Sequence, residues 1–433
     1  MFCSLLFTLA TIAERGRVIR ISLNKVWSRI FRVISVLILI ATTAGTYAEP
    51  ITRLSGVPAL EALKKYYVLP NFVIGGKYDL KNESSFESGG ADGVTLESLG
   101  PKPLRLSYIA VGTPKRDKNG KIVNAVIIST YYSGDSAFMY FFWYDGQKGN
   151  TFSKGPVVGP GKLIDTDKYY VIFLDALGLW GASKPSDGLG MNFPRYSILD
   201  CVQANYRLLK DHLGISKVKL ATGVSMGAIQ SYILAVLHPD FAEAIMPIGG
   251  ITASDPVSRW LFTLMTAAMQ SDPVWQKTNG DYYDLPKEQH PNRGMMFGWS
   301  ILGETGYSFD YRVKQKWDEV KKEVFYWEPT DDEGANLVSK AKDFDVDDLI
   351  FRNECLRNYD INDQLGRIKA KTLIIHVKND QWLRYVLAEK AASKIRGARL
   401  VGFESPLAHY AVFRAPNVCK EAVTGFFKDI GMK

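Results

Sequence analysis

Short apolar runs alternate with amphipathic segments along most of the chain. Residues 123–130 and 169–174 are continuous apolar runs, which is typical of strands buried on both faces of a sheet. Five further segments have strand character: 104–111, 218–222, 244–248, 372–377 and 398–403. Helical spacing appears at 196–213, 228–237, 387–395 and 418–427. This order predicts an α/β fold with a mostly parallel central sheet and helices on both faces.

The alternation stops between residues 254 and 366. That stretch is rich in Trp, Met and Tyr and contains helical pieces such as 313–324. We interpret it as an inserted helical cap over the carboxyl edge of the sheet, where open α/β sheets place their sites. The predicted organisation is a leader at 1–48, an N-terminal extension at 49–100, core segments at 101–253 and 367–433, and the cap at 254–366.

The tryptophans of the cap allow two interpretations. They are Trp260, Trp275, Trp299, Trp317 and Trp327. They could line a pocket for an apolar acyl group, but aromatic residues at helical spacing more often form the core of the cap itself. The acidic run 331–333 is expected to be a solvated loop.

The first 48 residues have the pattern of an export signal. Six basic residues and one acidic residue precede an apolar run at 33–44, and Thr46-Tyr47-Ala48 places small residues where a signal peptidase reads. The apolar run is shorter than the ~20 residues that span a bilayer. We therefore expect a periplasmic or secreted protein with no stable membrane span after leader removal. An uncleaved leader that anchors the chain in the membrane is the alternative.

Composition and charge narrow the function classes. The chain has 433 residues, of which 46% are hydrophobic, so a large core is expected. Most of the net charge of +8 lies in the leader, so no nucleic-acid partner is expected. The four cysteines, Cys3, Cys201, Cys355 and Cys419, form no CxxC motif. After leader removal they allow at most one disulfide, of no indicated pairing, and neither a metal site nor a cofactor is expected.

Gly223-Val224-Ser225-Met226-Gly227 is the clearest chemical motif. This G-x-S-x-G sequence lies between a predicted strand and a predicted helix, which is the context of a nucleophile elbow. Such a turn exposes the serine hydroxyl, and the glycines leave room for neighbouring chains. The Met226 N–H then lies at a helix N-terminus, where it can stabilise an oxyanion. The alternative is a tight turn with an inert serine.

A triad on this scaffold follows the chain order serine, acid, histidine. Of the two histidines after the cap, His376 lies within a predicted strand, whereas His409 follows the last strand, where the base is expected. Asp380 comes just after strand 372–377 and is the expected acid, which fixes the imidazole tautomer. Glu404 is the fallback acid. The non-catalytic alternatives are that His409 is a surface loop histidine and that Asp380 is an aspartate of a turn.

The second oxyanion donor is expected in the loop at 131–136, directly after strand 123–130. Gly134 lets the backbone of this loop turn inward, and the Tyr132 N–H is the candidate donor. A Gly-Asp turn without any function is the alternative.

Several segments share a pattern with one known family. They are 159–162, 165–172, Phe193-Pro194, 211–215, the Ser225-Met226-Gly227 elbow, 271–275 and Tyr359-Asp360. Over about 104–427 the chain resembles the homoserine O-acetyltransferases of the α/β-hydrolase superfamily. The resemblance implies an α/β-hydrolase fold with a helical lid, a triad of Ser225, Asp380 and His409, and oxyanion donors at Tyr132 and Met226.

Two positions depart from that family. The transferases carry an Arg where this chain has Thr266, and an Asp directly after the catalytic His, where this chain has Tyr410. The resemblance implies that these charges hold the carboxylate and amino group of homoserine. We therefore expect a different acceptor, which includes water.

Three functions remain in competition. We expect a serine hydrolase that cleaves an ester, thioester or amide of a small-molecule acyl substrate through an acyl-enzyme on Ser225. An acyltransferase with another acceptor shares the first half-reaction, and no motif separates the two. A non-catalytic binding module on the same scaffold is the third. The sequence does not determine the oligomeric state, and a homodimer is one of the open possibilities.

Overall fold

An eight-stranded sheet forms the centre of the computed structural model, which describes residues 58–314 and 344–432. The strand order is β1 (Lys65–Leu69), β4 (Leu104–Val111), β8 (Tyr170–Leu174), β5 (Ala125–Ser129), β9 (Val218–Val224), β10 (Ala244–Ile248), β11 (Lys371–Val377) and β12 (Arg399–Phe403). β4 pairs antiparallel with β1 and β8, and the other neighbours are parallel. The predicted α/β fold with a mostly parallel sheet is confirmed.

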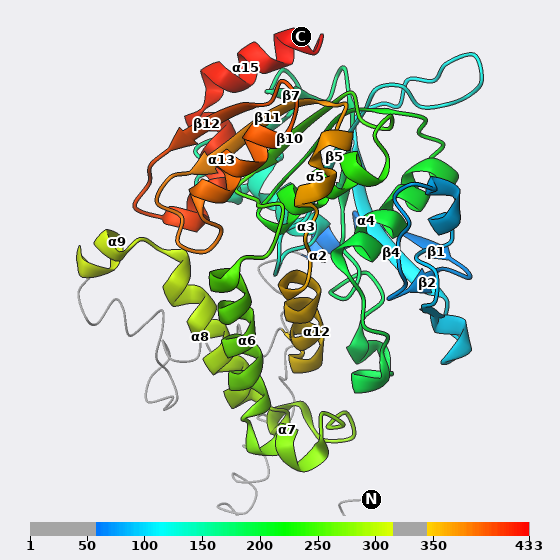
Figure 1. Cartoon of the computed structure of the whole chain (residues 1–433), viewed down its shortest axis with the longest axis vertical. Helices are drawn as coiled ribbons and strands as arrows, with labels where there is room; N and C mark the ends of the chain where they lie inside the picture. Colours follow the sequence, from blue (N-terminus) through cyan, green and yellow to red (C-terminus); the bar gives the residue numbers. More distant parts are fainter. Residues whose placement is uncertain (1–57, 315–343, 433) are drawn as a thin grey trace, which may run out of the picture. The chain divides into compact units, whose positions relative to one another are not determined.

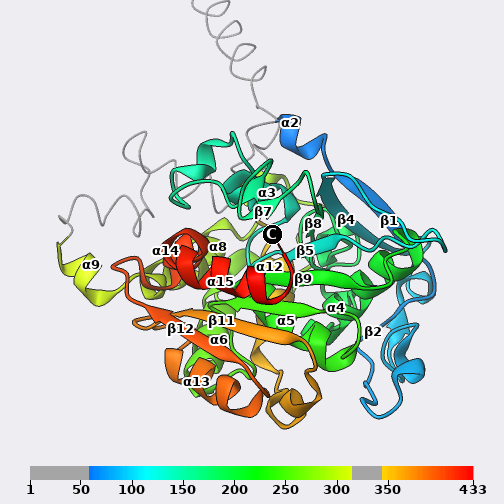
Figure 2. The same ribbon diagram turned by 90° about the horizontal axis from the view of Figure 1, so that it is seen from above.

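Helices cover both faces of this sheet (Figure 2). One face carries α4 (Ile198–Arg207), α5 (Met226–Leu237) and α13 (Tyr385–Lys394), and the other carries α3 (Ser136–Trp143), α14 (Ala415–Val418) and α15 (Lys420–Asp429). Successive side chains of β5 point to opposite faces, so Ile127 belongs to the core cluster that includes Ile229 of α5, while Ile128 belongs to the cluster that includes Met139 of α3. All five residues of β5 are buried, which explains its continuous apolar sequence.

The cap is helical in its described part and lies beyond one edge of the sheet (Figure 1). It contains α6 (Pro256–Gln270), α7 (Pro273–Thr278), α8 (Asn292–Gly306), α9 (Phe309–Lys314) and α12 (Val346–Arg357). α6 packs against both α8 and α12. The Ser308 N–H donates to the carbonyl of Pro406, so the cap is tied to the loop that precedes His409.

Smaller elements complete the described chain. They are α2 (Pro58–Glu61), β2 (Val73–Ile74), β3 (Val94–Thr95), β6 (Val158–Gly159) and β7 (Ile164–Asp165), with 3-10 turns such as Glu83–Phe86 and Ala408–Arg414. The helix predicted at 196–213 is α-helical to Arg207, continues as a π-helical turn, and ends at Gly214, which has a φ of 71°.

Some predictions lie outside the described residues. These are the leader 1–48, Cys3, Trp317, Trp327, the acidic run 331–333 and nearly all of the predicted helix 313–324. Cys201, Cys355 and Cys419 are all buried free thiols. Within 58–314 and 344–432, every helix is too short or too polar to span a bilayer.

Candidate active site

Ser225 occupies the sharp turn between β9 and α5. Its backbone has φ 55° and ψ −119°, a conformation that side-chain-bearing residues rarely adopt. The flanking glycines are needed for close packing, because a Cβ on Gly223 would lie 2.7 Å from the carbonyl oxygen of Ser129, and one on Gly227 only 2.2 Å from the same atom. The turn therefore has the strained geometry of a nucleophile elbow.

The structure brings Ser225, His409 and Asp380 together from three distant segments. Nε2 of His409 lies 2.8 Å from Oγ of Ser225, and Nδ1 of His409 lies 2.7 Å from Oδ2 of Asp380. All three residues are more than nine-tenths buried. The imidazole thus bridges a hydroxyl and a carboxylate, which is the arrangement that activates a serine for attack on a carbonyl carbon.

Backbone amides hold the carboxylate of Asp380 in place. Its Oδ1 accepts from the N–H groups of Trp382 at 2.8 Å and Leu383 at 3.0 Å, which leaves Oδ2 for His409. The ring of Trp382 packs edge-on against the imidazole, with 4.8 Å between the ring centroids. Glu404, the alternative acid, is exposed. His376 is buried in β11, as its place in a strand predicted.

The loop after β5 carries Tyr132 to the same site, and Tyr132 lines the cavity that contains Ser225. An ion pair anchors this loop, because Nζ of Lys64 lies 2.6 Å from Oδ2 of Asp135, and Asp135 also caps the first turn of α3. Met226 opens α5, where the first amide N–H groups have no partner within the helix. Tyr132 and Met226 therefore border the same cavity as Ser225.

Arg352 of α12 was not singled out from the sequence, yet it contacts both of these residues. It is fully buried, and its Nη1 lies 3.2 Å from the carbonyl oxygen of Tyr132 and 3.2 Å from Sδ of Met226. Its Nη2 donates to the carbonyl of Leu177 at 2.9 Å. Within the described chain no carboxylate lies within ion-pair distance of Arg352, so its guanidinium is held by neutral acceptors alone. A charged residue within a helix normally indicates a solvated face, so the sequence gave no sign that Arg352 is buried.

A narrow cavity extends from Ser225 toward the cap. Its walls include Ile229 of α5, Phe262 of α6 and Leu356 of α12. Each lining residue is uncharged, and Trp260, Trp275 and Trp299 of the cap do not line it. Among the described residues there is no cluster of three or more His, Cys, Asp or Glu side chains that could hold a metal ion.

The two positions that depart from the transferases supply no charge to this cavity. Oγ1 of Thr266 accepts from the side-chain amide of Asn353 at 3.1 Å, and the carbonyl oxygen of that amide accepts from the Tyr132 hydroxyl at 2.7 Å. The ring of Tyr410 packs against Tyr307, with 4.5 Å between the centroids. Thr266 thus serves a contact between the cap helices α6 and α12, whereas Tyr410 serves a contact between the cap and the core.

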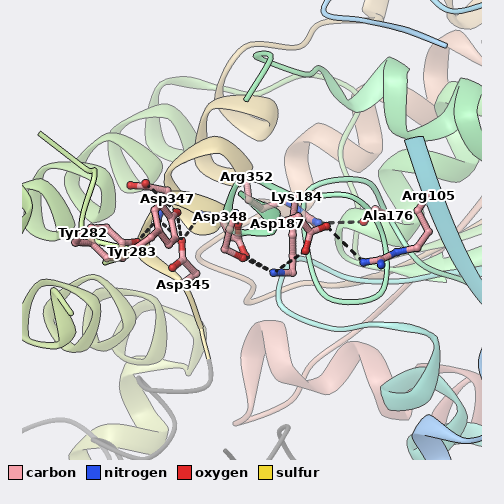
Figure 3. A network of polar contacts seen from close by, with 11 residues as sticks. Arg105, Ala176, Lys184, Asp187, Tyr282, Tyr283, Asp345, Asp347, Asp348 and Arg352 are labelled. Carbon is pink, nitrogen blue, oxygen red and sulfur yellow. Dashed lines mark hydrogen bonds and ion pairs between the residues drawn. The ribbon is translucent and has the colours of Figure 1, made fainter. Parts of the chain in front are cut away.

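A buried acidic turn joins the cap to the core at the start of α12 (Figure 3). Both Asp345 and Asp347 lie 3.1 Å from the hydroxyl of Tyr283, and Asp348 accepts from the Ser186 hydroxyl at 2.8 Å. Burial, and then the nearby charge of Asp345, raise the pKa of Asp347 to about 7. Burial also raises the pKa of Asp345 and of Asp348. One phenolic hydrogen cannot serve two carboxylates, which agrees with a proton held within this cluster.

The comparisons with known proteins agree with this fold. The chain is 27% identical over 361 residues to a homoserine O-acetyltransferase of Desulfotalea psychrophila, which covers 76% of this chain and 89% of that protein. An acetylester hydrolase of Corynebacterium glutamicum has a similar structure, with a TM-score of 0.67, 19% identity and coverage of 87% of this chain and 99% of that one. A homoserine O-acetyltransferase of Bacillus anthracis is similar at a TM-score of 0.64, 19% identity and coverage of 84% and 96%.

No protein-family model matches the chain. The relatives and the solved structures nevertheless agree on one scaffold, which the eight-stranded sheet and the cap also display. The chain is therefore an α/β-hydrolase-fold enzyme similar to the homoserine O-acetyltransferases.

Proposed function

We propose that the chain is a serine hydrolase that cleaves a carboxylic ester, thioester or amide through an acyl-enzyme on Ser225. The observation that carries the proposal is the continuous contact from Ser225 Oγ through His409 to Asp380, at 2.8 Å and 2.7 Å. The groups are already within the reach that proton transfer requires.

Each residue has a defined role in this mechanism. Oγ of Ser225 attacks the substrate carbonyl carbon while Nε2 of His409 takes the hydroxyl proton, and Asp380 stabilises the imidazolium that forms. The N–H groups of Met226 and Tyr132 donate to the oxyanion of the tetrahedral intermediate. His409 then protonates the leaving group, and a water molecule activated by the same imidazole hydrolyses the acyl-enzyme.

Acyl transfer is the second candidate, because a relative named homoserine O-acetyltransferase covers 76% of the chain. The uncharged residues at Thr266 and Tyr410 favour water, or a neutral alcohol, over an amino acid as acceptor. The experiment is to measure p-nitrophenol release from p-nitrophenyl acetate with and without added alcohols and homoserine. Release that does not depend on acceptor, with free acetate as product, supports hydrolysis. Release that requires an acceptor and yields its ester supports transfer.

We also infer that residues 1–48 direct the chain out of the cytoplasm. The support is the order of basic stretch, apolar run and small residues before Glu49 in the sequence. An anchored form that keeps the leader is the alternative, and the mature N-terminus separates the two.

A further inference from the structure

Two polar atoms near the proposed nucleophile have no hydrogen-bond partner among the residues that the structure describes. They are Oγ of Ser254 and Nε1 of Trp382, and the two residues are 6% and 8% exposed. Both residues line the cavity that opens at Ser225. Buried donors are nearly always satisfied in folded proteins, so two unpartnered donors on residues that line one cavity point to an acceptor supplied from outside the chain.

The other polar side chains of the cavity are already satisfied. The Tyr359 hydroxyl donates to the carbonyl of Ile251 at 3.1 Å, and the Ser258 hydroxyl donates to Asp255 at 2.8 Å. The Tyr132 hydroxyl donates to Asn353 at 2.7 Å. The missing partners are thus confined to Ser254 and Trp382, which reach the cavity from separate loops after β10 and β11.

The cavity suits the acyl part of the substrate. Both proposed oxyanion residues, Tyr132 and Met226, line the cavity together with Ser225. We therefore place the reacting carbonyl at the end of the cavity beside Ser225. His409 is not among the lining residues, yet it has to protonate the leaving group. The leaving alcohol therefore lies on the His409 side, outside the cavity, and the acyl chain points inward.

We propose that the cavity recognises a short acyl group that carries a neutral oxygen beyond its carbonyl, with Trp382 Nε1–H and the Ser254 hydroxyl as its hydrogen-bond partners. An indole N–H can only donate, so the substrate must supply an acceptor such as an ether, keto or hydroxyl oxygen. A carboxylate is disfavoured because each lining residue is uncharged. This inference rests on the proposed hydrolase function and names its substrate class.

The experiment compares p-nitrophenyl esters that differ only in that oxygen. Methoxyacetyl is paired with butanoyl, and 4-oxopentanoyl with 4-methylpentanoyl, and kcat/KM is measured for wild type, Ser254→Ala and Trp382→Phe. For each protein, kcat/KM for the oxygenated ester is divided by kcat/KM for its alkyl partner. The ratio of wild type is then divided by the ratio of the variant, which cancels the intrinsic reactivity of the esters. We expect this double ratio to be about three- to tenfold for at least one pair in each variant, the value of one neutral hydrogen bond.

Ser258→Ala is the matched control, because it removes a hydroxyl from the same cavity that is already bonded to Asp255. Ser258→Ala weakens the N-terminal capping of α6 by Asp255, so the melting temperature of this variant should fall. Its double ratio should stay near one. If both ester pairs react but neither ratio responds to Ser254→Ala or Trp382→Phe, the orphan atoms hold only water and the inference is overturned. If wild type releases p-nitrophenol from none of the esters, the proposed function itself fails and the inference falls with it.

Discussion

At the scale of single residues, two acidic side chains, Asp380 and Glu404, are candidates for orienting His409. Asp380 contacts Nδ1 of the imidazole, whereas Glu404 is exposed. We expect Asp380→Asn to lower kcat by about 10³- to 10⁴-fold without unfolding the protein, because an asparagine favours the wrong imidazole tautomer. Glu404→Gln serves as the control and should keep wild-type kcat. The assay is p-nitrophenyl acetate turnover with circular dichroism of each variant. Wild-type kcat in Asp380→Asn, with a loss in Glu404→Gln, would assign the role to Glu404 instead.

Arg352 offers a second test at the same scale. Its guanidinium contacts the carbonyl of Tyr132 and the side chain of Met226, so it positions both proposed oxyanion donors. We expect Arg352→Met to lower kcat by about 100-fold with little change in KM, since a donor displaced by about 1 Å costs that much. Arg352→Lys should recover part of the loss.

The kinetic split for Arg352→Met must be measured well below the melting temperature of the variant, because Arg352 also satisfies buried carbonyls of the core. A variant that melts earlier yet retains wild-type kcat would show that Arg352 is only structural.

At the scale of a single element, the first turn of α12 contains a carboxyl group, that of Asp347, whose titration affects stability. The pKa of Asp347 is raised to about 7 by burial and by Asp345, whereas an exposed aspartate titrates near 3.8. The folded state therefore holds more protons than the unfolded state between these values. Linkage then requires the free energy of unfolding to fall as pH rises from about 4 through about 7.

We expect Asp347→Asn to remove part of this pH dependence. The variant should melt a few degrees above wild type at pH 8 and lose that advantage at pH 5, because the amide is neutral at both. Asp363→Asn is the control, since the side chain of Asp363 is 97% exposed. Melting temperatures from pH 5 to pH 8 give the comparison. Curves for Asp347→Asn and wild type that run parallel would contradict the assignment.

At the scale of the whole molecule, the core strands were predictable and the edges of the fold were not. Strands such as β5 and β10 are buried on both faces, so their sequences are uninterrupted apolar runs. β1 was missed because it lies at the edge of the sheet and is largely exposed, which removes the alternation. α3 was missed because it is apolar nearly all round and shows no helical period.

The residues of the candidate site also fall into those that the sequence could predict and those that it could not. Ser225, Asp380 and His409 could be placed from a motif and the chain order that the fold imposes. Arg352 and the orphan atoms of Ser254 and Trp382 could not, because their significance depends on burial and on missing partners. No periodicity or spacing carries that information.

Processing of the leader is a prediction about the whole chain. We expect the protein, expressed in full in a Gram-negative host, to appear in the periplasm with Glu49 as its first residue. Replacing the apolar residues of 33–44 with polar ones should retain it in the cytoplasm at full length. N-terminal sequencing of each fraction decides the matter, and an intact N-terminus in the membrane fraction would instead favour the anchored form.

The most direct test of the central claim is to label the mature protein with a fluorophosphonate and locate the adduct by tandem mass spectrometry. We expect one adduct, on Ser225, absent from Ser225→Ala and formed far more slowly in His409→Ala. Failure to label Ser225, or labelling at the same rate without the imidazole, would contradict a serine activated by His409.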